Sequence, residues 1–518
     1  MRNSHHRAYR NAATFAALVA AAISLTACDL SPNFRLPDIT MPSVFKQDVA
    51  EDVASVAPAT DGRWKRFDDG ARIQEFAWWR MFGDTTLDGL MERAMKDNPT
   101  LEAARERVKS ARAVSDDRDA DLYPAIAVGV GPERSRQSPA SQEPNLPPGT
   151  SANVKPYTLY RAQGTISYEL DVFGRNRNRA LAAWFDAAGE QNNFLASRLS
   201  LQAELAQTYF RLAALTAEEK LLNRTLVTRE EALALLKKKL DVGAVDTLVV
   251  SSSETDLANV KAERANVSDA RKRAEHALAV LVGVPPSDLK LDAAVLVAEP
   301  PTVPAGMPSS LLERRPDILR AVEAMKAANA RIGVARTGYF PEISLSAMGG
   351  FVAGDVGDLF QWSNRTWMIG PLAGTAITQP IFEGGRIAAA RAQSDADYAE
   401  AVANYRAAVL QAFREVEDQL SGVGAASERM KATRDGLDAS ARAYRVAKAR
   451  YAAGYSSHIE LLDAERSNLA AERAHVQTQG DQYVATIQLI RALGGSWQTP
   501  GVPESIAPVE APTTRMKN

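Results

Sequence analysis

The chain has 518 residues, 46% hydrophobic and 24% charged, so it can bury a large core and lacks the composition of a disordered chain. Its 61 basic and 63 acidic residues give a net charge of −2, without the basic excess that a nucleic-acid binder needs. One cysteine excludes an intramolecular disulfide, and with five histidines the sequence predicts no metal centre and no cofactor. The mean hydropathy of −0.23 and a single long apolar stretch exclude a helical membrane protein.

The N-terminus predicts an export signal. Three arginines precede an apolar run at residues 13–25, which is too short to span a bilayer. The run leads to Leu25-Thr26-Ala27-Cys28, which resembles the lipobox of bacterial lipoproteins. The resemblance implies cleavage before Cys28 and acylation of Cys28, whereas the alternative is an ordinary signal peptide with a cysteine there by chance. Asp29 leaves the sorting open, because in enteric bacteria an aspartate at this place tends to retain a lipoprotein in the inner membrane.

The rest of the chain is a tandem duplication with a period of about 210 residues, since matching segments keep their order. The matches are Leu122-Tyr123-Pro124-Ala125-Ile126 with Tyr339-Phe340-Pro341-Glu342-Ile343, Phe173-Gly174-Arg175 with Phe382-Glu383-Gly384-Gly385-Arg386, Val242-Gly243-Ala244 with Ala453-Gly454-Tyr455, and Leu281-Val282-Gly283 with Ala492-Leu493-Gly494.

Each repeat predicts a short helix, two strands and a long helical region. Apolar and polar residues alternate around 166–170 and 343–347, in stretches of about ten residues, the length of a tilted transmembrane strand. The same alternation is typical of a half-buried soluble hairpin, so the pattern alone leaves both structures open. Polar segments at 134–157 and 353–365 predict exposed loops between the paired strands.

The helical regions are too long for a compact globule. Residues 386–423 carry one apolar stripe without proline, and residues 194–215 carry a stripe of the same kind. Such a helix reaches about 57 Å, so it must pack beside others as a coiled coil or a helical barrel. A coiled-coil rod is the alternative, and the export signal and interposed strands argue against it.

Several segments closely resemble one family. They are Trp78-Trp79 with Phe82-Gly83-Asp84, Leu311-Leu312-Glu313-Arg314-Arg315-Pro316-Asp317-Ile318, Ala327-Ala328-Asn329-Ala330-Arg331-Ile332-Gly333, Gln379-Pro380-Ile381-Phe382-Glu383-Gly384-Gly385-Arg386, Ala412-Phe413-Arg414-Glu415-Val416 and Leu461-Leu462-Asp463-Ala464-Glu465-Arg466. Over about residues 70–497, a span that holds both repeats, the chain resembles the outer-membrane efflux proteins of the TolC superfamily, in the OprM/NodT lipoprotein branch.

The resemblance implies an α+β membrane channel. Its members are homotrimers in which each protomer gives four strands to a twelve-stranded outer-membrane β-barrel that continues into a long periplasmic α-helical barrel. Two strands in each repeat agree with this count. We expect a signal peptide at 1–27, a lipidated tether at 28–70, repeats at 71–292 and 313–497 around a linker at 293–312, and a tail at 498–518.

The implied function is the passive outer-membrane channel of a tripartite efflux system. The implied partners are a periplasmic adaptor, an inner-membrane pump of the resistance-nodulation-division class and outer-membrane lipid. A type I protein-secretion channel has the same architecture and is the first alternative; a periplasmic structural rod is the second. No nucleotide-binding, zinc-protease or serine-hydrolase motif occurs in the sequence, so we predict no enzyme and no catalytic residues.

The residues that would control passage are predicted from the family, whose periplasmic end is closed by the turns between paired helices. We expect these turns near Ala213 and Ala214 in the first repeat and near Gly424 and Ala425 in the second. The family's pore-facing aspartate maps best onto Asp435, with Asp438 as second choice and Arg434 as the basic neighbour. The alternative is an ordinary solvated helix face.

Overall fold

The computed structural model describes residues 30–38, 77–136, 155–291, 314–370 and 376–495, together with single positions 45, 138, 296, 300, 301 and 303. The predicted signal peptide, Cys28, Asp29 and the tail at 498–518 lie outside these residues. None of the helices in the described part of the chain combines the length and apolar character that a membrane span requires.

The helices repeat in length and order, which confirms the duplication. In the first repeat they are α3 (Pro99–Ala120), α5 (Arg175–Asp241) and α6 (Thr247–Val282), of 22, 67 and 36 residues. In the second they are α8 (Pro316–Thr337), α9 (Arg386–Ala452) and α10 (His458–Ala492), of 22, 67 and 35 residues. Before the first repeat's α3 come a 3₁₀ turn, η1 (Trp78–Phe82), and α2 (Thr85–Asp97). The described residues also contain the 3₁₀ turns η3 (Pro286–Asp288), η5 (Val356–Asp358) and η6 (Trp362–Asn364).

One antiparallel sheet joins the two repeats. It contains β1 (Ala125–Ser135), β2 (Tyr157–Leu170), β3 (Glu342–Ala353) and β4 (Arg365–Ile369) in that order, and β5 (Ile377–Thr378) pairs with β3 on the same side as β4. The predicted strands around 166–170 and 343–347 are therefore confirmed. The predicted loops at 134–157 and 353–365 join β1 to β2 and β3 to β4.

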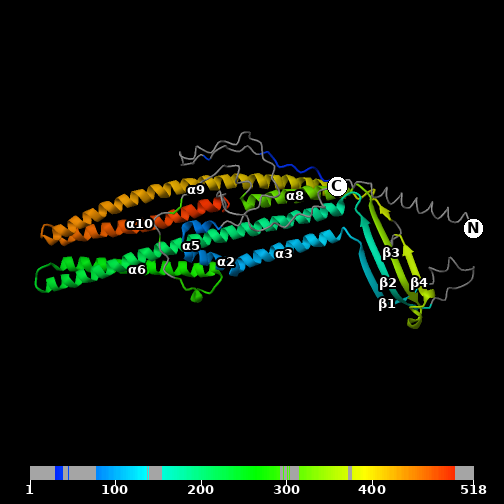
Figure 1. Ribbon diagram of the computed structural model, residues 1–518, viewed down its shortest axis with the longest axis horizontal. Helices are drawn as coiled ribbons and strands as arrows, with labels where there is room; N and C mark the ends of the chain where they lie inside the picture. The colour runs from blue at the N-terminus through cyan, green and yellow to red at the C-terminus, as the bar shows by residue number, and fades with distance from the viewer. Residues whose placement is uncertain are drawn as a thin grey trace, which may run out of the picture.

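The sheet and the helix turns lie at opposite ends of an elongated molecule (Figure 1). The long helices run side by side, and each folds back on its shorter partner, α5 on α6 and α9 on α10. A helix of 67 residues is about 100 Å long, so each long helix reaches from the sheet to the far turns.

The predicted positions of the far turns are wrong. Ala213 and Gly424 each lie 28 residues before the ends of their helices, at Asp241 and Ala452, and the backbone is helical through both. The turns fall instead at 242–246 and 453–457. A glycine inside a helix costs only about 1 kcal/mol, so Gly424 does not end α9, and Ala214 and Ala425 are likewise interior helix residues.

The real turns need glycine for another reason. Gly243 and Gly454, which the duplication matches to each other, have φ of 69° and 79°. This left-handed conformation costs a residue with a Cβ about 1–2 kcal/mol.

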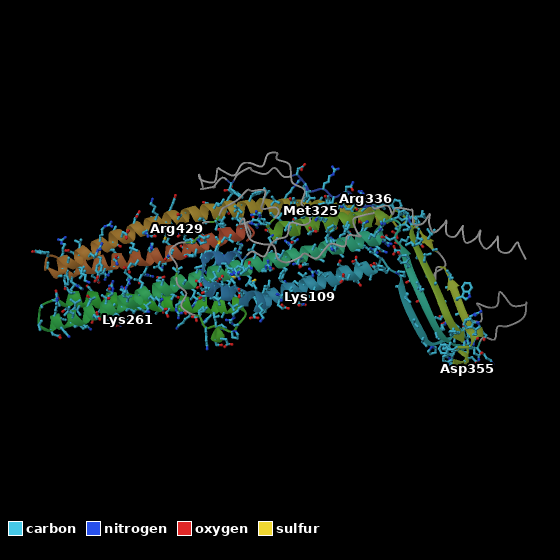
Figure 2. All side chains as sticks on the ribbon, viewed as in Figure 1. Lys109, Lys261, Met325, Arg336, Asp355 and Arg429 are labelled. Carbon is cyan, nitrogen blue, oxygen red and sulfur yellow. The ribbon has the colours of Figure 1, made fainter. Side chains whose placement is uncertain are left out.

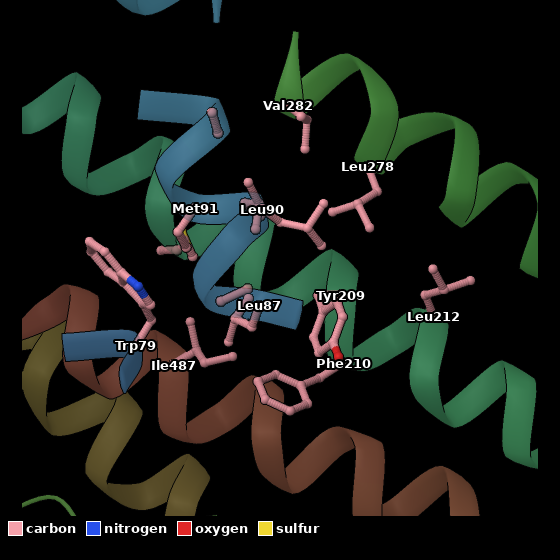
Figure 3. Packing of buried hydrophobic residues seen from close by; sticks show 14 of the residues in the cluster. Trp79, Leu87, Leu90, Met91, Tyr209, Phe210, Leu212, Leu278, Val282 and Ile487 are labelled. Carbon is pink, nitrogen blue, oxygen red and sulfur yellow. The ribbon is translucent and has the colours of Figure 1, made fainter. Parts of the chain in front are cut away.

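The main hydrophobic core lies midway along the helices. The η1 turn and α2 are wedged between α5, α6 and α10, and Figure 3 shows Leu87, Leu90 and Met91 of α2 at the centre of this cluster. Asp84 caps α2 and also accepts a hydrogen bond of 2.5 Å from the Tyr209 hydroxyl of α5. Burial, with the Asp84 carboxylate beside it, raises the pKa of Tyr209.

The segment Arg314-Arg315-Pro316-Asp317 joins the start of α8 to α9 and α10. Arg315 is buried and donates to Asp317 at 2.6 Å, to Glu415 of α9 at 2.7 Å and to the carbonyl of Ala492 at 2.9 Å. Burial acts to raise the pKa of Asp317, but the ion pair with Arg315 outweighs it and holds this pKa below its ordinary value. The motif therefore fixes the start of the second repeat against the end of its last helix.

Candidate functional site

The sheet has one apolar and one mostly polar face. Alternate side chains point to opposite faces, and the register places Ile126 beside Ile166, then Ala347, then Ile369. The apolar face carries Ile126, Val128, Val130, Ile166, Tyr168, Leu170, Ile343, Leu345, Phe351, Trp367, Ile369 and Ile377. The opposite face carries Arg161, Gln163, Thr165, Ser167, Glu169, Ser344, Ser346 and Thr366, and among them the apolar residues Leu159, Met348, Val352 and Met368.

The apolar face is bare. Val128 is 78% exposed, Trp367 72% and Ile369 79%, because the helices meet the sheet at its end and do not cover this face. A soluble hairpin would bury such a surface, since exposed apolar patches of this kind mark contact with a membrane or with another protein. The arrangement therefore favours the transmembrane structure over the soluble hairpin that the alternation also allowed.

Both edges of the sheet are open within the described residues. Here β1 pairs with β2 alone, and β4 and β5 pair with β3 alone. An unpaired strand edge is unfavourable in hydrocarbon, where each unsatisfied backbone group costs several kcal/mol. The sheet of one chain is thus an incomplete membrane structure.

Charged side chains join the sheet to the helices. Arg175, the first residue of α5, forms ion pairs with Glu169 of β2 and Glu342 of β3, and Arg177 pairs with Asp171 at 3.2 Å. Figure 2 shows Arg336 at this end of the sheet and Asp355 at the other. The arginines after the second strand therefore mark the boundary between sheet and helices.

The predicted constriction residues are exposed but do not lie at the far turns. Arg434, Asp435 and Asp438 project from α9, and Asp435 lies 17 residues before its end at Ala452, which corresponds to about 26 Å. The structure places these three residues together on the exposed surface of one helix.

Sequence reasoning missed the acidic groups beside the actual turn. Glu460 lies in the first turn of α10, and Asp463 follows one turn later. Glu460 also lines a shallow groove between α9 and α10 with Arg442 and Arg450. The glycine matched between the repeats, Gly454, was the signal that could have located this end.

A buried ion-pair cluster links the two helical hairpins near the same end. Asp256 of α6 pairs with Arg229 of α5 and accepts a hydrogen bond of 2.7 Å from Arg466 of α10. Asp256 and Arg229 are buried, and burial lowers the pKa of the Arg229 guanidinium while Glu465 acts in the opposite direction. A second link lies seven residues farther along α10. There Arg473 pairs with Glu218 of α5 at 2.9 Å and with Glu263 of α6 at 2.8 Å.

The described residues form an open sheet at one end of the molecule and two helix turns at the other. Within the described residues no group of three or more histidine, cysteine, aspartate or glutamate side chains is placed to hold a metal ion.

The model of the family described as outer membrane efflux protein matches residues 90–284 and again residues 307–495. The chain belongs to this family. The two matched segments correspond to the two repeats seen in the helices and strands.

Individual relatives agree over nearly the whole chain. The toluene efflux pump outer membrane protein TtgC of Pseudomonas putida is 32% identical over 505 residues, which cover 96% of this chain and 98% of the relative. Outer membrane protein OprJ of Pseudomonas aeruginosa is 31% identical over 485 residues, 92% of this chain and 94% of the relative.

The fold is shared with solved structures. The crystal structure of the open state of the outer membrane channel MtrE of Neisseria gonorrhoeae has a TM-score of 0.75 at 28% identity and covers 90% of this chain and 98% of its own. The chain therefore has the fold of an outer-membrane efflux channel.

The buried cluster generates a stability prediction. Asp256→Ala leaves Arg229 buried without its partner, and we expect it to lower the free energy of unfolding by about 3–5 kcal/mol. The matched control is Glu254→Ala, two residues away, whose ion pair with Lys237 is half exposed and is worth at most about 1 kcal/mol. Denaturant unfolding of the detergent-solubilised protein, followed by circular dichroism, measures both; equal losses would contradict a structural role for the buried pair.

Proposed function

We propose that this chain is the outer-membrane channel of a tripartite efflux system of the resistance-nodulation-division class. It conducts small molecules passively from a pump and adaptor across the outer membrane. The observation that carries the proposal is the sheet, which has a bare apolar face, a polar opposite face and two open edges, at the end of a helical bundle about 100 Å long.

The channel is proposed to be a homotrimer. Copies that pair β1 of one chain with the β4–β5 edge of the next remove every open edge, and closure is what a membrane-spanning sheet requires. A sheet that is four strands wide gives twelve strands in three copies, an even number within the range of outer-membrane barrels. The polar face then lines the lumen and the apolar face meets lipid.

The partners follow from the absence of any energy-converting motif in the sequence. The energy must come from an inner-membrane pump, and a periplasmic adaptor joins that pump to the far end of the helices. The names of the relatives, efflux pump outer membrane proteins, favour this system over type I protein secretion.

The proposed channel function is tested by measuring the conductance of the purified protein and its location in the cell envelope. Purified protein in planar bilayers is expected to form water-filled pores, and membranes separated on a density gradient should hold the protein in the outer-membrane fraction. A strain that lacks the chain should become more sensitive to toxic small molecules and recover with the intact gene. Absence of conductance would contradict the channel, and recovery with the inner membrane alone would make Asp29 a retention signal.

The N-terminal tether supports a lipid anchor at Cys28. The carbonyl of Leu30 accepts a hydrogen bond of 3.0 Å from Arg336, and that of Pro32 accepts one of 2.7 Å from Asn329, which holds the tether along α8. Arg336 lies at the sheet end of α8, so its hydrogen bond holds Leu30 at that end of the molecule. Acyl chains attached two residues earlier in the sequence would add about 0.8 kcal/mol of membrane binding for each buried CH₂.

Mass spectrometry of the N-terminal peptide is expected to show acylated Cys28 as the first residue of the mature protein. Cys28→Ser should lose the lipid but keep its place in the outer membrane, because a closed barrel holds the membrane without an anchor. An unmodified N-terminus at another residue would contradict the anchor.

We also propose that acidic residues line the lumen toward the far end, since one lumen-facing acid becomes a ring of three in a trimer. Such a ring favours cations. Asp435→Ala, beside Arg434, is expected to lower cation preference, with Asp438→Ala as second choice.

Because the turns lie beyond these residues, Glu460→Ala is expected to raise single-channel conductance more than either aspartate variant does. If selectivity and conductance are unchanged in both aspartate variants, Asp435 and Asp438 lie on the outer surface of the helices and not in the lumen.

A further inference from the structure

Two arginines lie on the apolar face of the sheet at its loop end, the end away from the helices (Figure 1). Arg365 of β4 pairs with Phe351 of β3, so the two side chains share the apolar face. Arg134 of β1 lies four residues after Val130, and side chains four residues apart along a strand point to the same face. Both arginines are exposed. Positive charge is therefore placed where the apolar surface ends.

The length of the strands puts these arginines at the border of the apolar band. At the helix end this band begins next to the ion pair of Arg175 with Glu342, at Ile343. Eight residues separate Ile343 from Phe351, which is about 27 Å along the strand and about 20 Å along the membrane normal at a strand tilt of about 40°. The apolar band of an outer-membrane barrel is about 25 Å tall. In the membrane position proposed above, Arg365 thus lies where hydrocarbon gives way to lipid headgroups.

Aromatic side chains hold Arg365 at this border. Its guanidinium lies over the ring of Trp362, 4.3 Å from the ring centroid. Beside it in the sheet, Phe351 contacts Phe360 edge to face, with ring centroids 5.7 Å apart. Phe360 and Trp362 are 71% and 72% exposed, as expected of rings at a membrane–water interface. A guanidinium that stacks through its face keeps its N–H donors, which lie in its plane, directed sideways.

Neither Arg134 nor Arg365 has an acidic partner within the described residues. On the opposite face of the same end, by contrast, Arg161 forms an ion pair of 2.7 Å with Glu133. Two further basic residues, Arg136 and Lys155, are exposed beside the first loop. The charge of the lipid-facing border is thus not neutralised by the part of the chain that the structure describes.

Two acids of the second loop are engaged in the loop itself. The Asp355 carboxylate accepts a hydrogen bond of 2.7 Å from the backbone N–H of Gly357, and that of Asp358 accepts one of 2.6 Å from the side chain of Gln361. These bonds shape the turns η5 and η6 and involve neither arginine.

We propose that Arg134 and Arg365 bind the phosphate groups of a lipid in the outer leaflet, namely the phosphorylated sugar headgroup of lipopolysaccharide. The inference rests on the outer-membrane channel proposed above and adds a ligand site on its outer wall. The charges are complementary, and a guanidinium can donate two parallel N–H···O bonds to one phosphate.

A lipid fits this site better than a soluble anion. The apolar face continues from the arginines toward the helices through Val130 and Trp367, and Trp367 is 72% exposed. Acyl chains can lie along this surface while the headgroup phosphate lies against the arginines. A soluble phosphate ion would use the arginines and leave the adjoining apolar surface uncovered.

The test is lipid binding to the purified full-length protein in detergent, measured by native mass spectrometry. Combining Arg134→Gln with Arg365→Gln is expected to lower the affinity for bisphosphorylated lipid A at least about tenfold, because charge-assisted hydrogen bonds are lost. Lipid A without its phosphates should bind the unsubstituted protein as weakly as that variant binds the phosphorylated form. The matched control, Arg161→Gln, removes an arginine from the opposite face and should keep the affinity.

The outcomes separate this inference from the proposed function. If the unsubstituted protein forms pores in planar bilayers but binds both forms of lipid A equally, the phosphate site is overturned and the channel stands. If the unsubstituted protein forms no pores, the channel itself is overturned. Displacement of lipid A by millimolar inorganic phosphate would make this a site for soluble anions and overturn the lipid as its ligand.

A second pair of variants leaves both arginines in place. Trp362→Ala removes the ring under Arg365 and should weaken binding of bisphosphorylated lipid A severalfold, whereas Trp362→Phe keeps a ring and should retain most of the affinity. Equal affinities of the alanine variant and the unsubstituted protein would overturn the stacked arginine as the phosphate ligand.

Discussion

The backbone of a strand edge sets the constraint on which the rest of this molecule depends. In an outer-membrane channel the bare apolar face of this sheet lies in lipid, and in lipid the edges of a sheet must be paired. One chain supplies a sheet four strands wide, too narrow to close on itself, so further copies have to complete it. Assembly is therefore a condition for membrane insertion of this sheet and not a later refinement of it.

Because the chain is duplicated, the two repeats are built from the same few kinds of contact. Helices of 67 residues recur in both repeats, each preceded by a glycine cap with a left-handed backbone, so both long helices leave the sheet in the same way. Among the described residues, the η1 turn and α2 have no counterpart in the second repeat, and they form a wedge between α5, α6 and α10. The resulting core ties three long helices together midway, and the ion pairs of Asp256 and Arg473 tie the hairpins together farther out.

The strands and the order of the repeats could be predicted from the sequence, because alternation of apolar and polar residues and matching short segments can both be read directly from it. The alternation around residues 166–170 and 343–347 gave the correct strands, and the register then showed a bare apolar face that no local pattern contains. The predicted turns are misplaced because they follow the family resemblance to the end of the apolar stripe at residues 386–423, whereas Gly243 and Gly454, which match in the duplication, lie at the real turns. The domain boundaries, the lipid on Cys28 and the lumen-facing acids stay predictions.

The sheet end and the far end of the helices are held together by different interactions. The sheet end is held by short ion pairs such as that of Arg177 with Asp171, and it keeps one shape because its backbone is paired. The far end is held by side chains alone, and Asp256 is the point where three helices share one carboxylate. Moving the α9–α10 hairpin away from α5 and α6 must separate Arg466 from Asp256 and Arg473 from Glu218. Each separation exposes charges to water that solvate them well, so the penalty is modest once water enters. We therefore expect these ion pairs to hold the α9–α10 hairpin against α5 and α6 as long as Asp256 and Glu218 stay buried.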